Sequence, residues 1–163
     1  MSTVSESWKT DRIGSALAGA NPTIIARLPT GFAAIGDVQF LPGYSVLLSD
    51  TRADRLLDLP RQQRRDFLAD MDLLGEAVHI VCSEMDPGFR RVNYEIHGNQ
   101  DAILHAHIWP RYDWEPHQYR SSPVGLYPCA TWNSSAAQLG PQHRGLRDRL
   151  ADVTARLAFG AAD

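Results

Sequence analysis

Two histidines separated by a single residue are the side chains in this sequence best placed to do chemistry. The segment 103–112 reads Ile-Leu-His-Ala-His-Ile-Trp-Pro-Arg-Tyr, and its alternating residue types predict a β-strand. Successive side chains of a strand point to opposite faces, so His105 and His107 share one face, which Ile103 and Trp109 extend. The other face carries apolar side chains that can pack into a core: Leu104, Ala106 and Ile108. A pair of imidazoles held in this way is a candidate nucleophile, proton donor or metal-binding site.

The residues that follow the pair predict where this strand ends. Proline cannot donate to a sheet ladder, so Pro110 predicts that the strand leaves the sheet there, with Arg111 and Tyr112 just beyond it. On that reading, Arg111 and Arg120 either pair with phosphates of a ligand or are solvated.

Length and charge restrict the class of protein. A chain of 163 residues predicts a single domain, residues 1–163. The net charge of −3 and the lack of a basic block predict no nucleic-acid partner. No apolar run approaches the ~20 residues that span a bilayer, which predicts no membrane partner. The two cysteines, Cys82 and Cys129, and an N-terminus without a charged-then-apolar leader predict a cytoplasmic location.

The pattern of apolar residues and turn residues predicts an α+β domain. A short helix capped by Thr10 or Asp11 precedes the strands, and a long amphipathic helix interrupts them. The strands are expected at 23–28, 31–35, 44–48, 89–96 and the histidine segment, and the helices at about 10–18, 60–84 and 144–159, with a loop-like stretch at 113–142. Strands in this order favour an antiparallel sheet with the long helix across one face, and the other face free for a ligand.

The turn before the histidine strand allows two readings. Gly98, Asn99 and Gln100 offer backbone N–H groups and side-chain amides that can cradle an anion without a cationic side chain. The same residues are also typical of an ordinary hairpin turn.

Two stretches around this turn resemble the histidine triad (HIT) proteins, and among them the bacterial members similar to diadenosine tetraphosphate hydrolases. The stretches are Asn-Tyr-Glu-Ile-His-Gly-Asn-Gln-Asp at 93–101 and His-Ala-His-Ile-Trp-Pro-Arg-Tyr at 105–112. The family's motif has three histidines that alternate with apolar residues, often with Pro-Arg three residues after the last. Counted back from Pro110, His107 matches the third histidine and His105 the middle one, while Ile103 occupies the place of the first.

The resemblance extends upstream to a Pro-Gly turn and the strand after it, in residues 40–47. A histidine is more usual in the family at Tyr44. The motif-bearing core spans about 24–116, and the resemblance says little about the loop-rich segment and helix at 117–163. It implies a HIT-like antiparallel sheet of about five strands, a long helix packed across it, a C-terminal helix and a homodimer.

The activity that the resemblance implies is hydrolysis or transfer of a nucleotidyl group. The substrate is a dinucleoside polyphosphate or nucleoside phosphoramidate, attacked at its α-phosphate to form a nucleotidyl-histidine, with no cofactor and no metal. Residue by residue, the resemblance makes His105 the nucleophile and His107 a donor to phosphate oxygens. It assigns ribose or phosphate contacts to Asn93 and to the phosphate loop formed by Gly98, Asn99 and Gln100.

Ile103 departs from the family's pattern, because isoleucine can only pack where a histidine would take part in a polar network. Three consequences are open: slower turnover with binding retained, a changed leaving-group preference, or a substitute such as His97 or His117. One alternative function is therefore a nucleotide-binding protein with little or no catalysis.

A second alternative is a metal-binding protein that uses His105 and His107. Further ligands would be sought among His97, His117, Glu95 and Asp113. The sequence has no second ligand pair at a recognisable spacing, and Pro-Arg-Tyr directly after the pair favours the triad family.

Aromatic side chains cluster within and after the histidine strand. They can stack on a base or form the wall of a pocket, or they can simply fill the core. They are Trp109, Trp114, Tyr119, Tyr127 and Trp132.

Overall fold

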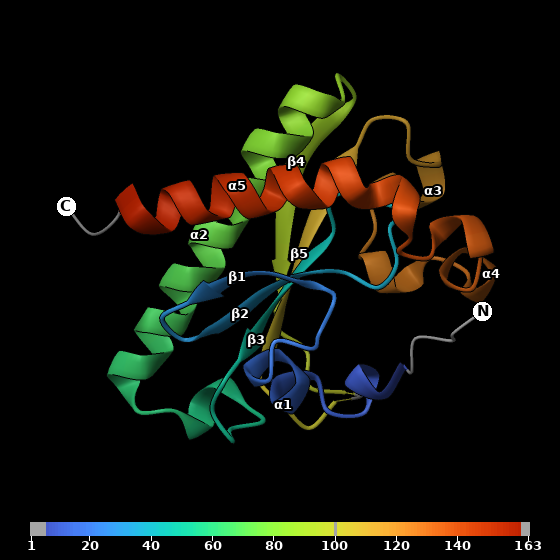
Figure 1. The fold of residues 1–163 in the computed structure, drawn as a ribbon. Coiled ribbons are helices and arrows are strands. Elements are labelled where there is room, and N and C mark those ends of the chain that lie inside the picture. Colours follow the sequence, from blue (N-terminus) through green and yellow to red (C-terminus); the bar gives the residue numbers. More distant parts are fainter. Residues whose placement is uncertain (1–5, 100, 161–163) are drawn as a thin grey trace.

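A computed structural model describes residues 6–99 and 101–160 (Figure 1). Five strands form one antiparallel sheet in the order β1-β2-β3-β5-β4, which places β4 at an edge. The strands are β1 (Ile24–Leu28), β2 (Gly31–Ile35), β3 (Ser45–Ser49), β4 (Phe89–Glu95) and β5 (His105–Tyr112). The prediction of an α+β domain with an antiparallel sheet is thus confirmed.

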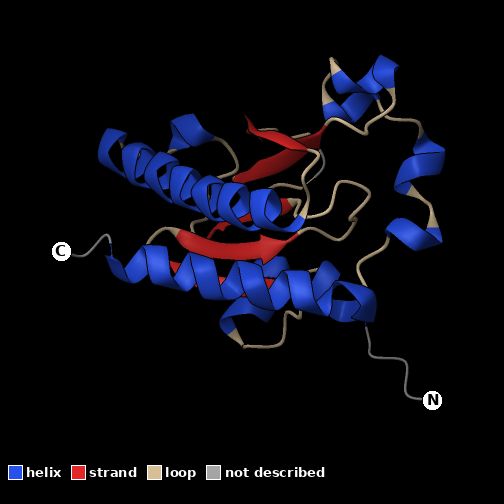
Figure 2. Ribbon diagram, turned by 90° about the horizontal axis from the view of Figure 1, so that it is seen from above, coloured by secondary structure: helices blue, strands red, loops and turns tan. Residues whose placement is uncertain are grey.

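Two long helices and several short ones accompany the sheet. The α-helices are α1 (Arg12–Leu17), α2 (Arg61–Met85), α3 (His117–Arg120), α4 (Cys129–Trp132) and α5 (Arg144–Gly160). Short 3-10 helices are η1 (Glu6–Lys9), η2 (Leu56–Asp58), η3 (Val124–Leu126), η4 (Ser135–Ala137) and η5 (Pro141–His143). Figure 2 shows the two long helices beside the strands. Within the described residues, no helix is both long and apolar enough to cross a membrane.

The main core lies between one face of the sheet and the helices α2 and α5. The periodic apolar residues of α2 are all buried there, as the helical spacing predicts: Phe67, Met71, Leu74, Val78 and Val81. Leu146, Leu150 and Val153 of α5 join the same cluster, as do Ala106 and Ile108 of β5. Ala106 and Ile108 thereby fix one side of β5, and His105 and His107 alternate with them and line a pocket on its other side.

A smaller apolar cluster covers part of the opposite face. It joins Ala16 of α1 to Phe32, Ala34 and Leu48 of the sheet. Helix α1 begins after Asp11, whose carboxylate accepts a hydrogen bond from the Gly14 N–H at 2.8 Å, so Asp11 is the cap. This helix stands beside the face that carries the histidines.

The predicted limits of the histidine strand are wrong at both ends. β5 begins at His105 rather than Ile103, and it continues through Pro110 to Tyr112, with Pro110 opposite Val92 of β4. The pairing with β3 ends where Ser45 meets Ile108, so beyond that point β5 has β4 as its neighbour in the sheet. A proline is tolerated in a strand that has an open side.

The reading of Arg111 as a solvated side chain is wrong, because its guanidinium is buried in an ion pair. Nε and Nη2 donate to the carboxylate of Glu115, with Nη2 at 2.8 Å from Oε2, and the two side chains are only 4% and 0% exposed. Glu115 also accepts hydrogen bonds from the Tyr112 N–H and the Tyr127 hydroxyl, each at 2.7 Å. This pair fixes the segment after β5 against the sheet, and that segment contains short helices rather than the expected loop alone.

Candidate active site

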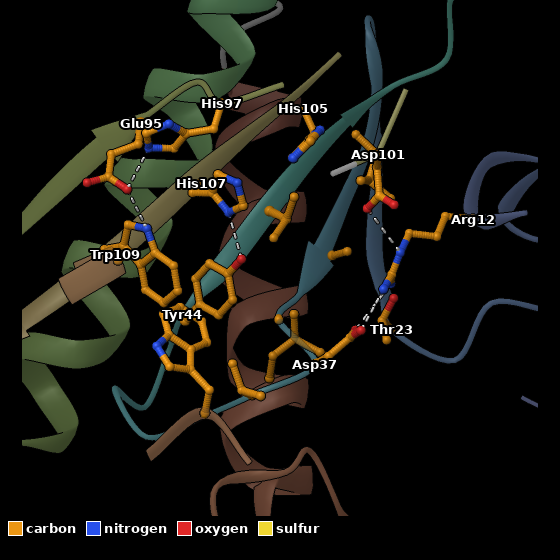
Figure 3. Close-up of a pocket in the computed structure, with 18 of the residues that line it drawn as sticks. Arg12, Thr23, Asp37, Tyr44, Glu95, His97, Asp101, His105, His107 and Trp109 are labelled. Atoms are coloured by element: carbon orange, nitrogen blue, oxygen red, sulfur yellow. Dashed lines mark hydrogen bonds and ion pairs between the residues drawn. The ribbon is translucent and has the colours of Figure 1, made fainter. Parts of the chain in front are cut away.

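A pocket of about 630 Å³ opens on the face of the sheet that carries the histidines (Figure 3). His105, His107 and Trp109 of β5 line it, together with side chains of β2, β3, the loop after β4 and the N-terminal helix. The C-terminal segment closes one side with Pro123, Gly125 and Trp132. Histidine nitrogens, aromatic rings and carboxylates therefore meet in one cavity.

His105 is held in one orientation by the backbone. Its Nδ1 lies 2.7 Å from the carbonyl oxygen of Ile103, and the residue is 8% exposed. A carbonyl can only accept, so Nδ1 carries the proton of this hydrogen bond. In the neutral ring the lone pair is then on Nε2, which is the atom able to attack an electrophile.

His107 lies beside His105, with the ring centroids 4.9 Å apart, and its Nδ1 is 2.7 Å from the hydroxyl oxygen of Tyr44. Burial lowers the pKa of His107 from its ordinary value of 6.5 to about 4, with further contributions from His105 and His97. His107 is therefore neutral at physiological pH.

The lowered pKa of His107 predicts a loss of stability in mild acid. The unfolded chain takes up this proton near pH 6.5 and the folded chain only near pH 4, so the free energy of unfolding falls as the pH decreases between these values. The expected loss from this one group is about 2–3 kcal/mol. Urea unfolding at a series of pH values tests this, and His107→Gln should remove that part of the slope. An unchanged slope in the variant would contradict the assignment.

Aromatic rings form one wall of the pocket. Tyr44 stacks on Trp109 with ring centroids 3.5 Å apart and planes within 8°, and Trp132 meets Trp109 edge to face at 5.8 Å. The Trp109 indole N–H donates to Glu95 at 3.0 Å, which fixes the ring (Figure 3). Both functions considered for the aromatic cluster occur, because Trp109 and Trp132 line the pocket while Tyr127 is buried against Phe40.

The remaining two aromatic residues lie elsewhere. Tyr119 packs against Tyr127 with the rings tilted by 30° and their centroids 4.6 Å apart. Trp114 is half exposed against Tyr112, and neither residue lines the pocket.

The opposite wall carries an ion pair that the sequence analysis missed. Arg12, the first residue of α1, contacts Asp37 at 2.6 Å and Asp101 at 3.9 Å. Asn21 helps to hold this helix by donating to the Arg12 carbonyl oxygen at 3.2 Å. The capped helix was visible in the sequence, but nothing there indicated that its first turn returns to the site.

The structure brings together only some of the residues proposed to contact phosphate. Asn99 lines the pocket, and Gly98 is exposed on the same loop, whereas Gln100 lies outside the described residues. Asn93 faces Trp109 across the strands but lines an adjoining polar cavity of about 290 Å³. That cavity also contains Arg90, Arg91 and Arg120, and Glu95 borders both cavities.

Ile103 occupies an apolar site, where it packs against the cluster of Phe32, Ala34 and Leu48. Of its two proposed substitutes, His97 lines the pocket, with its ring centroid 5.8 Å from that of His107 and a 3.2 Å contact to Glu95. His117 starts α3 and does not line the pocket. In the described part of the chain, no three His, Cys, Asp or Glu side chains are grouped so that they could hold a metal ion.

Comparison with known proteins identifies the class of fold. No family model matches the chain, and no curated protein sequence matches it. Solved structures do match: a histidine triad protein from Marinobacter aquaeolei VT8 is 18% identical with a TM-score of 0.66, over 83% of this chain and 90% of the other. A hypothetical histidine triad nucleotide-binding protein from Sulfolobus tokodaii strain 7 is 11% identical with a TM-score of 0.62, over 89% and 91% of the two chains.

A zinc-bound histidine triad family protein from Mycobacterium smegmatis is also similar, at 15% identity and a TM-score of 0.58, over 91% of this chain and 94% of that one. At these identities the likeness concerns the fold. The chain has the fold of the histidine triad proteins, with its histidine pair on β5 and a pocket in front of it.

Proposed function

We propose that this protein hydrolyses or transfers nucleotidyl groups, acting at the α-phosphate of a dinucleoside polyphosphate or nucleoside phosphoramidate, with His105 as nucleophile. The observation that carries the proposal is the hydrogen bond from His105 Nδ1 to the Ile103 carbonyl, because it leaves the Nε2 lone pair free beside a neutral His107. The resemblance of residues 93–101 and 105–112 favours a substrate related to those of diadenosine tetraphosphate hydrolases, and the shared fold favours a nucleotide ligand in general.

The proposed reaction has two displacements at phosphorus. In the first, Nε2 of His105 forms a bond to the α-phosphorus as the bond to the leaving group breaks, and the leaving group takes a proton from solvent. The ring is then a cation, whose Nδ1–H still donates to the Ile103 carbonyl. In the second, water or another acceptor attacks phosphorus and gives its proton to solvent, the P–N bond breaks, and Nε2 regains its lone pair.

The pocket has an aromatic part that suits a base and a part lined by histidines that suits phosphate. The partly exposed ring of Trp132 offers apolar surface for a base, and His107 lies beside the position that phosphate oxygens would occupy if His105 attacks. Gly98, Asn99 and Gln100 are proposed as the phosphate loop. Asn93 could contact only a part of the substrate that extends past Glu95 into the adjoining cavity. The proposal needs no cofactor or metal, and the expected homodimer and cytoplasmic location remain predictions.

Turnover of a substrate panel tests this function. The purified protein would be incubated with diadenosine polyphosphates and adenosine phosphoramidates, and AMP release followed by chromatography. The expected result is multiple turnovers of at least one of them. The second candidate, nucleotide binding without catalysis, is favoured by Ile103 in the place of the first histidine. It predicts that AMP binds while every substrate stays intact over hours.

Ile103→His tests what the missing histidine does. The hydrogen bond to His105 comes from the backbone of Ile103, so the substitution should keep it and leave turnover within about tenfold of the wild type. The apolar cluster would receive a polar ring, which should lower stability by about 1–2 kcal/mol. Steady-state kinetics and urea unfolding measure the two effects. Loss of turnover in this variant would contradict the role given to the carbonyl.

A further inference from the structure

Among the described residues, the phenol of Tyr44 is the hydrogen-bond partner of His107 at its inner nitrogen, Nδ1. Its oxygen lies 2.7 Å from Nδ1, with the Tyr44 side chain buried at the base of the pocket (Figure 3). Each of the two atoms can in principle donate or accept, so the direction of this hydrogen bond depends on which one carries the proton.

The position of Tyr44 is fixed from several sides. Its ring stacks on Trp109, and its carbonyl oxygen accepts hydrogen bonds from the Gly36 N–H at 2.8 Å and the Gln39 side-chain amide at 2.9 Å. A Cβ at Gly36 would lie 2.1 Å from the Tyr44 ring, so only glycine leaves room for this packing. The phenol is thus held against His107 rather than resting there as one of several rotamers.

The direction of the hydrogen bond follows from counting protons. Burial raises the pKa of Tyr44, so the phenol keeps its proton at physiological pH. Within the described residues, His107 Nδ1 is the hydrogen-bond partner of this hydroxyl. If Nδ1 also carried a proton, two donors would face each other and the phenol hydrogen would have no acceptor. The arrangement that satisfies both groups has Tyr44 donating to the Nδ1 lone pair.

We propose that Tyr44 is a positioning residue that fixes His107 as its Nε2–H tautomer, so that His107 presents a hydrogen-bond donor to the ligand. His105 is held in the opposite tautomer, with Nδ1–H bound to the Ile103 carbonyl and the Nε2 lone pair exposed to the ligand. The two neighbouring histidines thereby have different functions. The Ile103 carbonyl leaves His105 as a nucleophile, and the Tyr44 hydroxyl makes His107 a hydrogen-bond donor.

The consequence for catalysis rests on the proposed function, whereas the tautomer does not. A neutral donor aimed at a phosphate oxygen stabilises the charge that develops there, and its effect depends on its orientation. Loss of the phenol hydroxyl should therefore act through His107 and reduce kcat more than it changes KM.

The first test is NMR of the imidazole nitrogens in the ligand-free protein, which needs no substrate. Correlation of ring nitrogens with ring protons should show His107 protonated at Nε2 with a hydrogen-bonded lone pair at Nδ1, and His105 protonated at Nδ1. In Tyr44→Phe, the chemical shift of His107 Nδ1 should move to the value of an unprotonated imidazole nitrogen that accepts no hydrogen bond. Tyr127→Phe, which removes a buried phenol that donates to Glu115, should leave that signal unchanged. A proton on Nδ1 of His107 in the wild type would overturn the proposal.

The second test is a double-mutant cycle on turnover. Tyr44→Phe should lower kcat roughly tenfold in the wild-type background and less than about twofold when His107 is already alanine. A purely structural role would give the same loss in both backgrounds and would overturn the assignment, as would an unchanged kcat in Tyr44→Phe. If no substrate turns over, the proposed function fails, while the NMR result still decides the tautomer.

Discussion

Replacing His105 by alanine is expected to lower turnover by at least about 10³-fold while leaving the Kd for AMP within about tenfold of the wild type. The nucleophile contributes to the covalent step, whereas binding depends on the rest of the pocket, so the two quantities should separate. Steady-state kinetics and calorimetric titration with AMP measure them.

His117→Ala is the matched control for this variant, because His117 is a histidine at the start of α3 that does not line the pocket. Its turnover should equal that of the wild type. Hydrolysis at the wild-type rate by His105→Ala would rule out the proposed mechanism, because that mechanism requires a bond between Nε2 of His105 and phosphorus.

The largest effect on stability is expected at Glu115. Glu115→Ala leaves the buried guanidinium of Arg111 without its counter-ion and removes the acceptor for the Tyr112 N–H and the Tyr127 hydroxyl. Breaking a buried pair in this way costs about 3–5 kcal/mol, because a charge remains away from both water and a partner. Urea unfolding should show this loss in the midpoint of the transition.

An exposed ion pair on α5 provides the comparison for Glu115→Ala. Asp152 contacts Arg156 at 3.4 Å, and both side chains are more than half exposed. Asp152→Ala should change the free energy of unfolding by less than about 0.5 kcal/mol. A change of similar size in both variants would contradict the view that burial makes the Arg111–Glu115 pair important.

Local patterns in the sequence predicted the elements that obey a strong period. The apolar spacing of α2 predicts one buried helix face, and the alternation in β5 predicts a buried row of apolar side chains. The apolar residues of α2 and Ala106 and Ile108 of β5 are buried as expected. The prediction that β5 leaves the sheet at Pro110 is wrong because the restriction on proline concerns a strand with neighbours on both sides. Which strands lie beside Pro110 is decided by the sheet order, which no local pattern contains.

The residues around the histidines were harder to predict because they come from distant parts of the chain. Tyr44 was noted in the sequence only as a departure from the family's pattern, and its contact with His107 joins residues 63 positions apart. Arg12 and Asp37 meet through the packing of α1 beside the sheet, which depends on the tertiary fold. The resemblance assigns Asn93 a contact with ribose or phosphate. Asn93 and Glu95 lie on the same strand, β4, but only Glu95 lines the histidine pocket, while Asn93 lines the adjoining cavity.

The most direct test of the proposed chemistry is mass spectrometry of the protein quenched during incubation with adenylated and guanylated substrates. A nucleotidyl-histidine intermediate adds one nucleoside monophosphate to the chain, and peptide mapping locates it. The expected result is an adduct on His105 that is missing from His105→Ala and decays when substrate is removed. Substrate turnover with no adduct, or with an adduct on another residue such as His97, would contradict the assignment of His105 as nucleophile.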